Sequence, residues 1–168
     1  MSDPKVIVIM GSESDFPAMK AGVDVLDQFG VAHEVIVASA HRTPARVMKI
    51  ASEAEGRGVQ LFIAGAGMAA HLAGVIAAHT VLPILGVPME GGALNGVDAL
   101  YSTVQMPGGI PVASLGIGKH GAKNAGYKAV AILALSDAGL REKLHAYRDS
   151  LNGAVDGMNE RVQAQLGS

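Results

Sequence analysis

A continuous apolar run, Val6-Ile-Val-Ile-Met10, is followed at once by the polar loop Gly11-Ser-Glu-Ser-Asp15. A short run rich in β-branched residues is typical of a parallel strand that is buried on both faces. Apolar residues spaced from Phe16 to Phe29 predict an amphipathic helix after the loop, and Gly30 stands where its C-terminal cap belongs. The stretch therefore predicts a strand, a glycine loop and a helix, which together form the first unit of an α/β fold.

The same order of strand, loop and helix recurs along residues 1–135. Alternation of this kind predicts an open, parallel, doubly wound sheet with right-handed crossovers. Thr43 is expected to cap the second helix, with Pro44 in its first turn. We expect the remaining strands at 33–37, 61–64, 83–87 and 111–115, and the remaining helices at 44–55, 69–79, 97–105 and 121–135.

Residues 136–168 form a separate pattern, a single long helix with one apolar stripe. This helix follows a complete α/β unit, which leaves little of its own core to cover. The stripe therefore favours packing on a neighbouring subunit, while packing on its own domain remains open. We expect one domain over 1–168, with a core at 1–135 and a helical extension at 136–168. The stripe consists of Leu140, Leu144, Leu151, Val155, Met158, Val162 and Leu166.

The composition excludes several classes of protein. The chain has 168 residues, of which 49% are hydrophobic and 17% charged, with a net charge of −2 and no cysteine. Disorder requires the opposite balance, and a disulfide scaffold or a cysteine-ligated metal site is impossible. The charge gives no reason to bind a nucleic acid, and no apolar run is long enough to span a membrane. We expect a cytoplasmic protein whose weakly charged surface is covered by other subunits.

Three loops follow strands, at the edge where open parallel sheets bind ligands. In the first loop, the hydroxyls of Ser12 and Ser14 and the free N–H groups of the next helix suit a phosphate. Asp15 would repel phosphate, so a ribose diol is its natural partner. An alternative that is compatible with binding is that Ser14 or Asp15 caps the helix.

The second loop, 39–44, holds the best acid–base candidate of the chain. The imidazole of His41 exchanges protons near neutral pH, and Arg42 can hold a phosphate with two parallel hydrogen bonds. A solvated surface loop is the alternative. The position of this loop at the end of a strand favours a binding or catalytic role.

The third loop, 65–71, reads Gly-x-Gly-x-x-Ala-His, which is close to a dinucleotide fingerprint. It follows the third strand rather than the first and lacks the later acidic partner, so a flexible loop whose amides line a pocket is the plainer reading. His71 either belongs to the site or caps the next helix.

The turn-rich segment 105–111 is either a tight loop or a wall of a site. No spacing of histidines and carboxylates predicts a metal site.

Taken together, the loops resemble one family, the class I N5-carboxyaminoimidazole ribonucleotide mutases of purine biosynthesis. The chain departs from the family's usual pattern at Met68, Ala73, Gly91-Gly92 and Gly126-Tyr127-Lys128, none of which is a proposed catalytic group. The matching segments are Met-Gly-Ser-x-Ser-Asp at 10–15, Ser-Ala-His-Arg-Thr-Pro at 39–44, Ala-Gly-Ala-Gly-x-Ala-Ala-His-Leu at 64–72, Pro-x-Leu-Gly-Val-Pro at 83–88, Val-Gln-Met-Pro-x-Gly-Ile-Pro-Val at 104–112 and Ile-Gly-Lys-x-Gly-Ala-x-Asn-Ala at 117–125.

The resemblance implies a flavodoxin-like α/β/α sandwich of three layers and a single catalytic domain. It also implies a homo-octamer in which the C-terminal helix embraces a neighbour. The implied reaction moves a carboxylate from N5 to C4 of a phosphorylated imidazole ribonucleotide, without cofactor or metal. The related class II enzymes use free carbon dioxide; Arg42 and the 64–72 loop favour class I. Direct carboxylation of aminoimidazole ribonucleotide and a non-enzymatic, flavodoxin-like nucleotide-binding domain remain the alternatives.

The resemblance also implies roles for individual residues. His41 is the proton-transfer residue. The 64–72 loop is expected to close over the imidazole and the migrating carboxyl group. The implied substrate-binding residues are Ser12, Ser14, Asp15, Ser39, Arg42, Gly67, Ala70, His71 and Leu72.

Overall fold

The computed structural model describes residues 3–167, and its contacts divide the chain into two compact units between Ala129 and Val130. The first unit holds one five-stranded parallel sheet, with strand order β2-β1-β3-β4-β5. The chain runs outward from β1 to β2 and then returns to place β3 on the other side of β1. This reversal makes the carboxyl ends of β1 and β3 a topological switch point. The strands are β1 (Val6–Met10), β2 (His33–Val37), β3 (Leu61–Ala66), β4 (Ile84–Pro88) and β5 (Ala113–Ser114).

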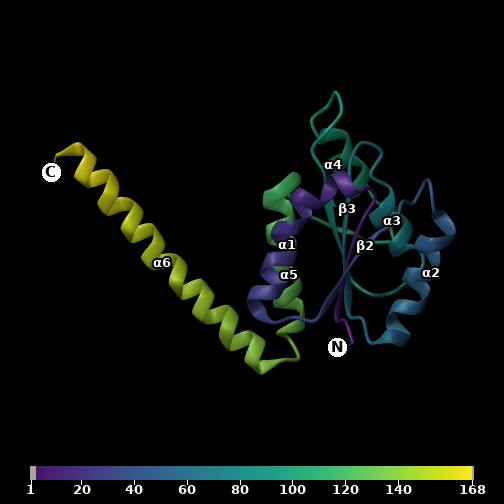
Figure 1. Cartoon of the computed structure of the whole chain (residues 1–168), viewed down its shortest axis with the longest axis horizontal. Coiled ribbons are helices and arrows are strands. Elements are labelled where there is room, and N and C mark those ends of the chain that lie inside the picture. Colours follow the sequence, from purple (N-terminus) through teal and green to yellow (C-terminus); the bar gives the residue numbers. More distant parts are fainter. Residues whose placement is uncertain (1–2, 168) are drawn as a thin grey trace. The chain divides into compact units, whose positions relative to one another are not determined.

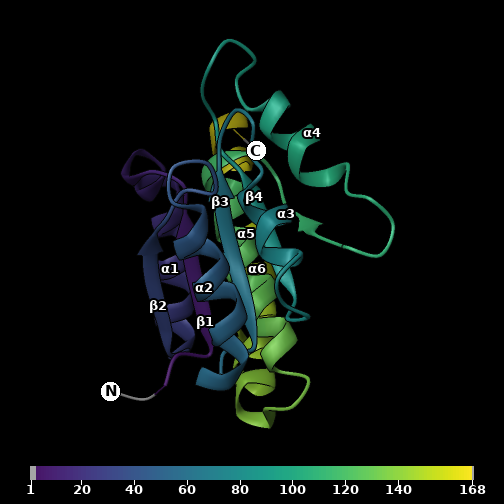
Figure 2. The same cartoon turned by 90° about the vertical axis from the view of Figure 1, so that its right-hand side faces the viewer.

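Helices cover both faces of the sheet, as the alternating pattern predicts. Figure 1 shows α1 (Phe16–Phe29) and α5 (Gly118–Leu133) on one face, and α2 (Pro44–Ala54) and α3 (Leu72–Ala77) on the other. Figure 2 shows α4 (Val97–Val104) beside β4, and its contacts are with β4 and β5. All five residues of β1 are buried, because this strand lies inside the sheet and is covered from both sides. The fold is therefore the predicted three-layer α/β/α sandwich.

Small residues let α1 and α5 approach closely within the first unit. A Cβ added to Gly22 would lie 2.6 Å from the carbonyl oxygen of Ala122, and one added to Gly126 would lie 2.8 Å from the Cβ of Val25. Both separations are too short for a carbon side chain, so glycine is required for this spacing. The small residues of α5 therefore allow its close packing on α1.

The predicted elements all exist, but some ends differ. Strand β3 runs two residues further than predicted, to Ala66, because its last residues pair with β4. Strand β5 is only Ala113–Ser114, whereas a strand over 111–115 was expected. Helix α3 starts at Leu72 instead of 69. Met68 adopts a left-handed backbone with φ of 49°, which interrupts a helix, and residues 69–71 remain in the loop.

The expected cap at Thr43 is wrong in its detail. Thr43 occupies the N-cap position of α2, but its side chain makes no capping hydrogen bond. Its Oγ1 instead accepts from the backbone N–H of Ser39 and donates to the carbonyl of Ser39, both at 3.0 Å. The hydroxyl therefore closes the loop that precedes the helix.

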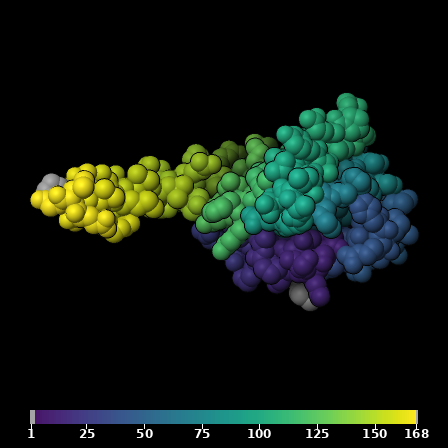
Figure 3. All heavy atoms as spheres, turned by 90° about the horizontal axis from the view of Figure 1, so that it is seen from above, coloured from purple at the N-terminus to yellow at the C-terminus, as the bar shows by residue number. Residues whose placement is uncertain are grey.

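Helix α6 (Ala138–Leu166) dominates the second unit and is the predicted long C-terminal helix. The side chain of Asp137 caps it by accepting from the N–H of Leu140 at 3.0 Å. None of its described residues is buried, and Figure 3 shows it as a single rod, light green to yellow. Within this unit, the members of the apolar stripe on the distal half of α6 are exposed: Leu151, Val155, Met158, Val162 and Leu166.

Candidate active site

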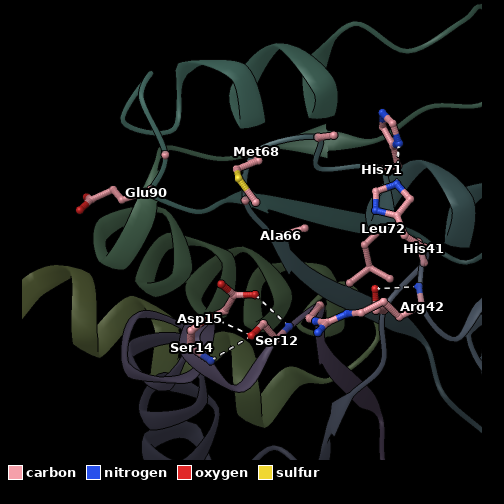
Figure 4. Close-up of a pocket in the computed structure, with 17 residues that line it drawn as sticks. Ser12, Ser14, Asp15, His41, Arg42, Ala66, Met68, His71, Leu72 and Glu90 are labelled. Carbon is pink, nitrogen blue, oxygen red and sulfur yellow. Dashed lines mark hydrogen bonds between the residues drawn. The ribbon is translucent and has the colours of Figure 1, made fainter.

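A cavity of about 530 Å³ lies at the carboxyl ends of four strands, where the loops after β1, β2, β3 and β4 converge (Figure 4). This is the edge of the sheet at which ligands bind in open α/β folds. All but one of the substrate-binding and catalytic residues expected from the sequence line it. The residues brought together are Ser12, Ser14, Asp15, Ser39, His41, Arg42, Gly67, His71 and Leu72.

The loop after β1 is held by its own side chains. The Oγ of Ser12 accepts from the N–H of Ser14 at 3.3 Å and from the Ser14 hydroxyl at 2.9 Å. The Oδ2 of Asp15 accepts from the N–H of Ser12 at 3.1 Å, which completes a capping box around a short 3₁₀ turn, η1 (Glu13–Asp15). Asp15 stands at the N-cap of α1 without capping it, so the cap proposed for that helix is wrong. Ser12 and Asp15 therefore cap η1 and also line the cavity.

Partial burial raises the pKa of Asp15 above its ordinary value of 3.8. The hydrogen bond from the Ser12 backbone and the positive charge of Arg42 act in the opposite direction, but burial has the larger effect. A half-buried carboxylate at the wall of a cavity is a costly group to keep for stability alone. Its position favours a binding role, in which the carboxylate accepts hydrogen bonds from a ligand.

We predict that Asp15→Asn raises the melting temperature of the unliganded protein at pH 7. The folded state holds the Asp15 proton more tightly than the unfolded chain does, because its pKa is raised. The stability that this proton adds is complete below pH 3.8 and is lost as the pH rises through the folded pKa. Thermal unfolding from pH 3.5 to 7 should show the advantage of the variant growing with pH. Glu55→Gln removes an exposed acid as the control; a pH-independent gap would contradict the prediction.

The loop after β2 carries Arg42 back toward the loop after β1. The Nη2 of Arg42 donates to the carbonyl of Gly11 at 2.9 Å, and its backbone N–H donates to the Oγ of Ser39 at 3.2 Å. The guanidinium has five N–H donors, so this bond leaves others for a ligand. Figure 4 shows Arg42 directed toward Ser12. The two loops therefore form one polar end of the cavity, with a positive charge and serine hydroxyls.

Two histidines from different loops meet in the cavity. The Nε2 of His41 lies 2.9 Å from the Nδ1 of His71, and the two rings stand edge to face with their centroids 5.0 Å apart. One ring must donate and the other accept, so a single proton lies between these two nitrogens. His71 does not make a capping hydrogen bond to α3, although it occupies the N-cap position. Of the two roles left open for His71, the structure therefore favours the site.

The loop after β3 brings small and apolar groups to the cavity. Ala66, Gly67, Met68 and Leu72 line it, with Met68 exposed. Ala70 differs from the other expected residues, because it is only 2% exposed and does not line the cavity. It packs on the core side of the loop and supports the residues on either side of it.

The loop after β4 was missed by the sequence analysis. Glu90, Gly91 and Gly92 line the cavity, and Figure 4 shows the side chain of Glu90 turned away from the histidines. The rule that sites follow parallel strands applies to β4 as well, and it identifies this loop once the strand is placed. No residue from 105 to 111 lines this cavity within the described chain, so the proposal that this segment walls a site stays a prediction.

Residues 3–167 hold neither a cluster of metal ligands nor a membrane-spanning helix. No group of three or more histidine, cysteine or acidic side chains is placed to hold a metal ion in that part of the chain. Within the same residues, no helix has both the length and the apolar character needed to cross a membrane.

The chain is similar to several known proteins. The chain is 54% identical over 152 residues to an N5-carboxyaminoimidazole ribonucleotide mutase of Synechocystis, an alignment that covers 90% of this chain and 85% of the relative. It is 45% identical over 164 residues to the mutase of Thermotoga maritima, covering 98% and 94%. The crystal structure of Treponema denticola PurE superposes with a TM-score of 0.84 at 27% identity, over 94% of this chain and 98% of that one.

A family model described as AIR carboxylase matches residues 5–153, which include every residue that lines the cavity. The match covers the whole sheet and most of the helices. On this evidence, the chain belongs to the AIR carboxylase family.

Proposed function

We propose that the chain is an N5-carboxyaminoimidazole ribonucleotide mutase of purine biosynthesis. It moves the carboxylate of its substrate from the exocyclic nitrogen N5 to the ring carbon C4 and yields 4-carboxy-5-aminoimidazole ribonucleotide. The observation that carries the proposal is the contact of His41 with His71 in a cavity whose other end holds Arg42 and serine hydroxyls. Relatives with this activity are about half identical over nine-tenths of the chain, which supports the same assignment.

The substrate is bound through its three chemical parts. Its phosphate interacts with Arg42 and with the hydroxyls of Ser12, Ser14 and Ser39, all of which line one end of the cavity. The ribose diol donates to the carboxylate of Asp15. The loop after β3 holds the imidazole, through Gly67, His71 and Leu72, while Ala70 supports that loop from the core.

His41 transfers the protons of the reaction. The bond between N5 and the carboxylate carbon breaks, carbon dioxide leaves, and N5 takes a proton from the His41 imidazolium. The electron pair of the ring then forms a bond from C4 to the carbon of carbon dioxide. The imidazole of His41 removes the proton left on C4 and is restored. One residue serves as acid and then as base, so the step needs no cofactor.

The walls of the cavity suit an intermediate that must not escape. Carbon dioxide is small and apolar, and it must stay beside C4 until the new bond forms. Ala66, Met68 and Leu72 supply apolar surface to the cavity that holds the histidine pair. Water must be kept out of this volume during the reaction, and the 64–72 loop is the segment that would close over the imidazole and the migrating carboxyl group.

The alternative is the carboxylation of aminoimidazole ribonucleotide with free carbon dioxide. The matching family model carries the name of that activity, but the relatives that are about half identical to this chain are named mutases. The decisive assay gives purified protein N5-carboxyaminoimidazole ribonucleotide without bicarbonate, and in parallel aminoimidazole ribonucleotide with bicarbonate. Efficient conversion of the first substrate supports the mutase. Conversion in the second assay only would assign the carboxylase, and binding without conversion in either would assign a nucleotide-binding domain.

We further propose that the chain works as a cytoplasmic homo-oligomer, an octamer. The open apolar stripe of α6 supports this, because five of its members are at least 40% exposed. Exposed apolar residues that gather on one surface mark interaction sites in many proteins. Sedimentation of the full chain should give a mass several times that of one subunit. The double variant Val155→Glu and Val162→Glu should lower that mass, and an unchanged assembly would argue against α6 as the contact.

A further inference from the structure

A second cavity of about 420 Å³ adjoins the active site on the side of the phosphate-binding residues. The two cavities share a wall made of Gly11, Ser12, Ser39 and Arg42. We call the second one the outer cavity. Beyond the shared wall it is lined by Glu13, Val37, Ala38, Thr43 and Arg46. A phosphate held by the shared wall therefore faces the outer cavity as well.

The shared wall carries hydrogen-bond donors that have no acceptor in the described part of the chain. The Oγ of Ser12 accepts two hydrogen bonds and the Oγ of Ser39 accepts one, so each hydroxyl keeps its own proton to donate. Arg42 uses its Nη2 on the carbonyl of Gly11. Among residues 3–167, no ion pair or side-chain hydrogen bond engages the guanidinium of Arg46. These donors therefore line the outer cavity, and all but Arg46 also line the active site.

The charges at the start of α2 also favour an anionic ligand in the outer cavity. Arg46 lies in the first turn of α2, which contains no acidic residue, and Arg42 precedes that helix. The N-terminus of a helix carries a partial positive charge, so two guanidinium groups there repel the helix and each other. Glu13 is the acid facing this cavity, and it leaves the three side chains with a formal charge of +1. A dianionic group between the two arginines would relieve the repulsion.

We propose that Arg46 is a second guanidinium for the phosphate of the substrate, and that the outer cavity is the phosphate end of the active site. The ligand class is a dianionic phosphate monoester. The inference rests on the proposed function, because it assumes a phosphorylated substrate. Arg46 touches only the phosphate, so it acts on binding and leaves the proton transfers of His41 unaffected.

The test compares four proteins: the native chain, Arg46→Gln, Glu13→Gln and Lys49→Gln. Lys49 is the matched control, because it lies on α2, is exposed, pairs with Glu53 at 3.9 Å and lines neither cavity. Two readouts are needed. The first is the dissociation constant of inorganic phosphate, measured by calorimetry without substrate. The second is the KM and kcat for the ribonucleotide at two ionic strengths.

We expect Arg46→Gln to weaken phosphate binding and raise KM by about 3- to 5-fold, the size of an exposed charge pair, with kcat unchanged. The salt dependence of KM should fall with it. Glu13→Gln should strengthen phosphate binding by about 2-fold, since it removes the opposing charge. Lys49→Gln should match the native chain within error.

The proposal is overturned if Arg46→Gln and Lys49→Gln bind phosphate equally well, or if Arg46→Gln lowers kcat and leaves KM unchanged. The titration with inorganic phosphate does not depend on the reaction. If the native chain converts neither ribonucleotide, the proposed function fails, while the titration still decides whether Arg46 contributes to an anion site.

Discussion

Replacing His41 by asparagine is expected to lower kcat by about 1000-fold or more while substrate binding remains within a few-fold of the native value. His41 supplies the proton to N5 and removes the proton from C4, and an amide can do neither. Asparagine keeps a polar group near His71, to which the Nε2 of His41 lies at 2.9 Å, so the loop after β3 keeps a hydrogen-bonding partner. Steady-state kinetics together with calorimetric titration of the substrate would separate chemistry from binding.

His79→Asn is the matched control for this variant. His79 is exposed, its Nδ1 bonds to the carbonyl of Val75 at 2.8 Å, and it lines no part of the cavity. We expect the kcat and KM of this variant to equal the native values, since His79 belongs to none of the loops that line the cavity. Substantial turnover by His41→Asn would refute the assignment of His41. Equal loss in the His79 variant would indicate a general effect of removing imidazole.

Replacing Arg42 by lysine is expected to raise KM by about 10- to 100-fold, the value of one or two charge-assisted hydrogen bonds. Lysine keeps the positive charge but cannot hold a phosphate with two parallel N–H groups. It also gives up the geometry of the bond from Nη2 to Gly11, which joins the first two loops. The rise should be much smaller for an unphosphorylated substrate analogue, because the interaction concerns the phosphate.

Arg57→Lys is the control for a conservative change at an arginine that is paired on the surface. Arg57 pairs with Glu34 and lines neither cavity. Surface pairs of this kind contribute little, so its KM should equal the native value. An unchanged KM in Arg42→Lys as well would show that the phosphate binds elsewhere, and it would also remove the basis for a role of Arg46.

The strands and their loops could be predicted because local physics determines them. β1 is buried on both faces and reads as an uninterrupted apolar run, and β2 agrees with its predicted limits of 33 and 37. The start of α3 could not be predicted in this way. Alanine favours a helix at 69–70, but the left-handed backbone of Met68 and the turn up to His71 oppose it. Contacts with neighbouring loops outweigh helix propensity in this segment.

Glu90 is a second feature of the site that could not be predicted from the sequence. Its loop follows β4 and lines the cavity, yet no residue type in it stands out as a catalytic group. Only the convergence of four strand ends shows that it belongs to the site. Ala70 illustrates the reverse, since a residue inside a matching motif is buried behind the loop and does not reach the cavity.

By itself, the sequence determined the α/β class, the order of the elements and the loops in which the chemistry lies, because burial patterns and turn residues act over short stretches of chain. The tertiary structure alone decided which groups meet. His41 and His71 are 30 residues apart, and Arg42 reaches a carbonyl 31 residues away. The first contact depends on the crossover that places β3 beside β1, and the second depends on the pairing of β1 with β2. No local preference of the chain encodes either arrangement.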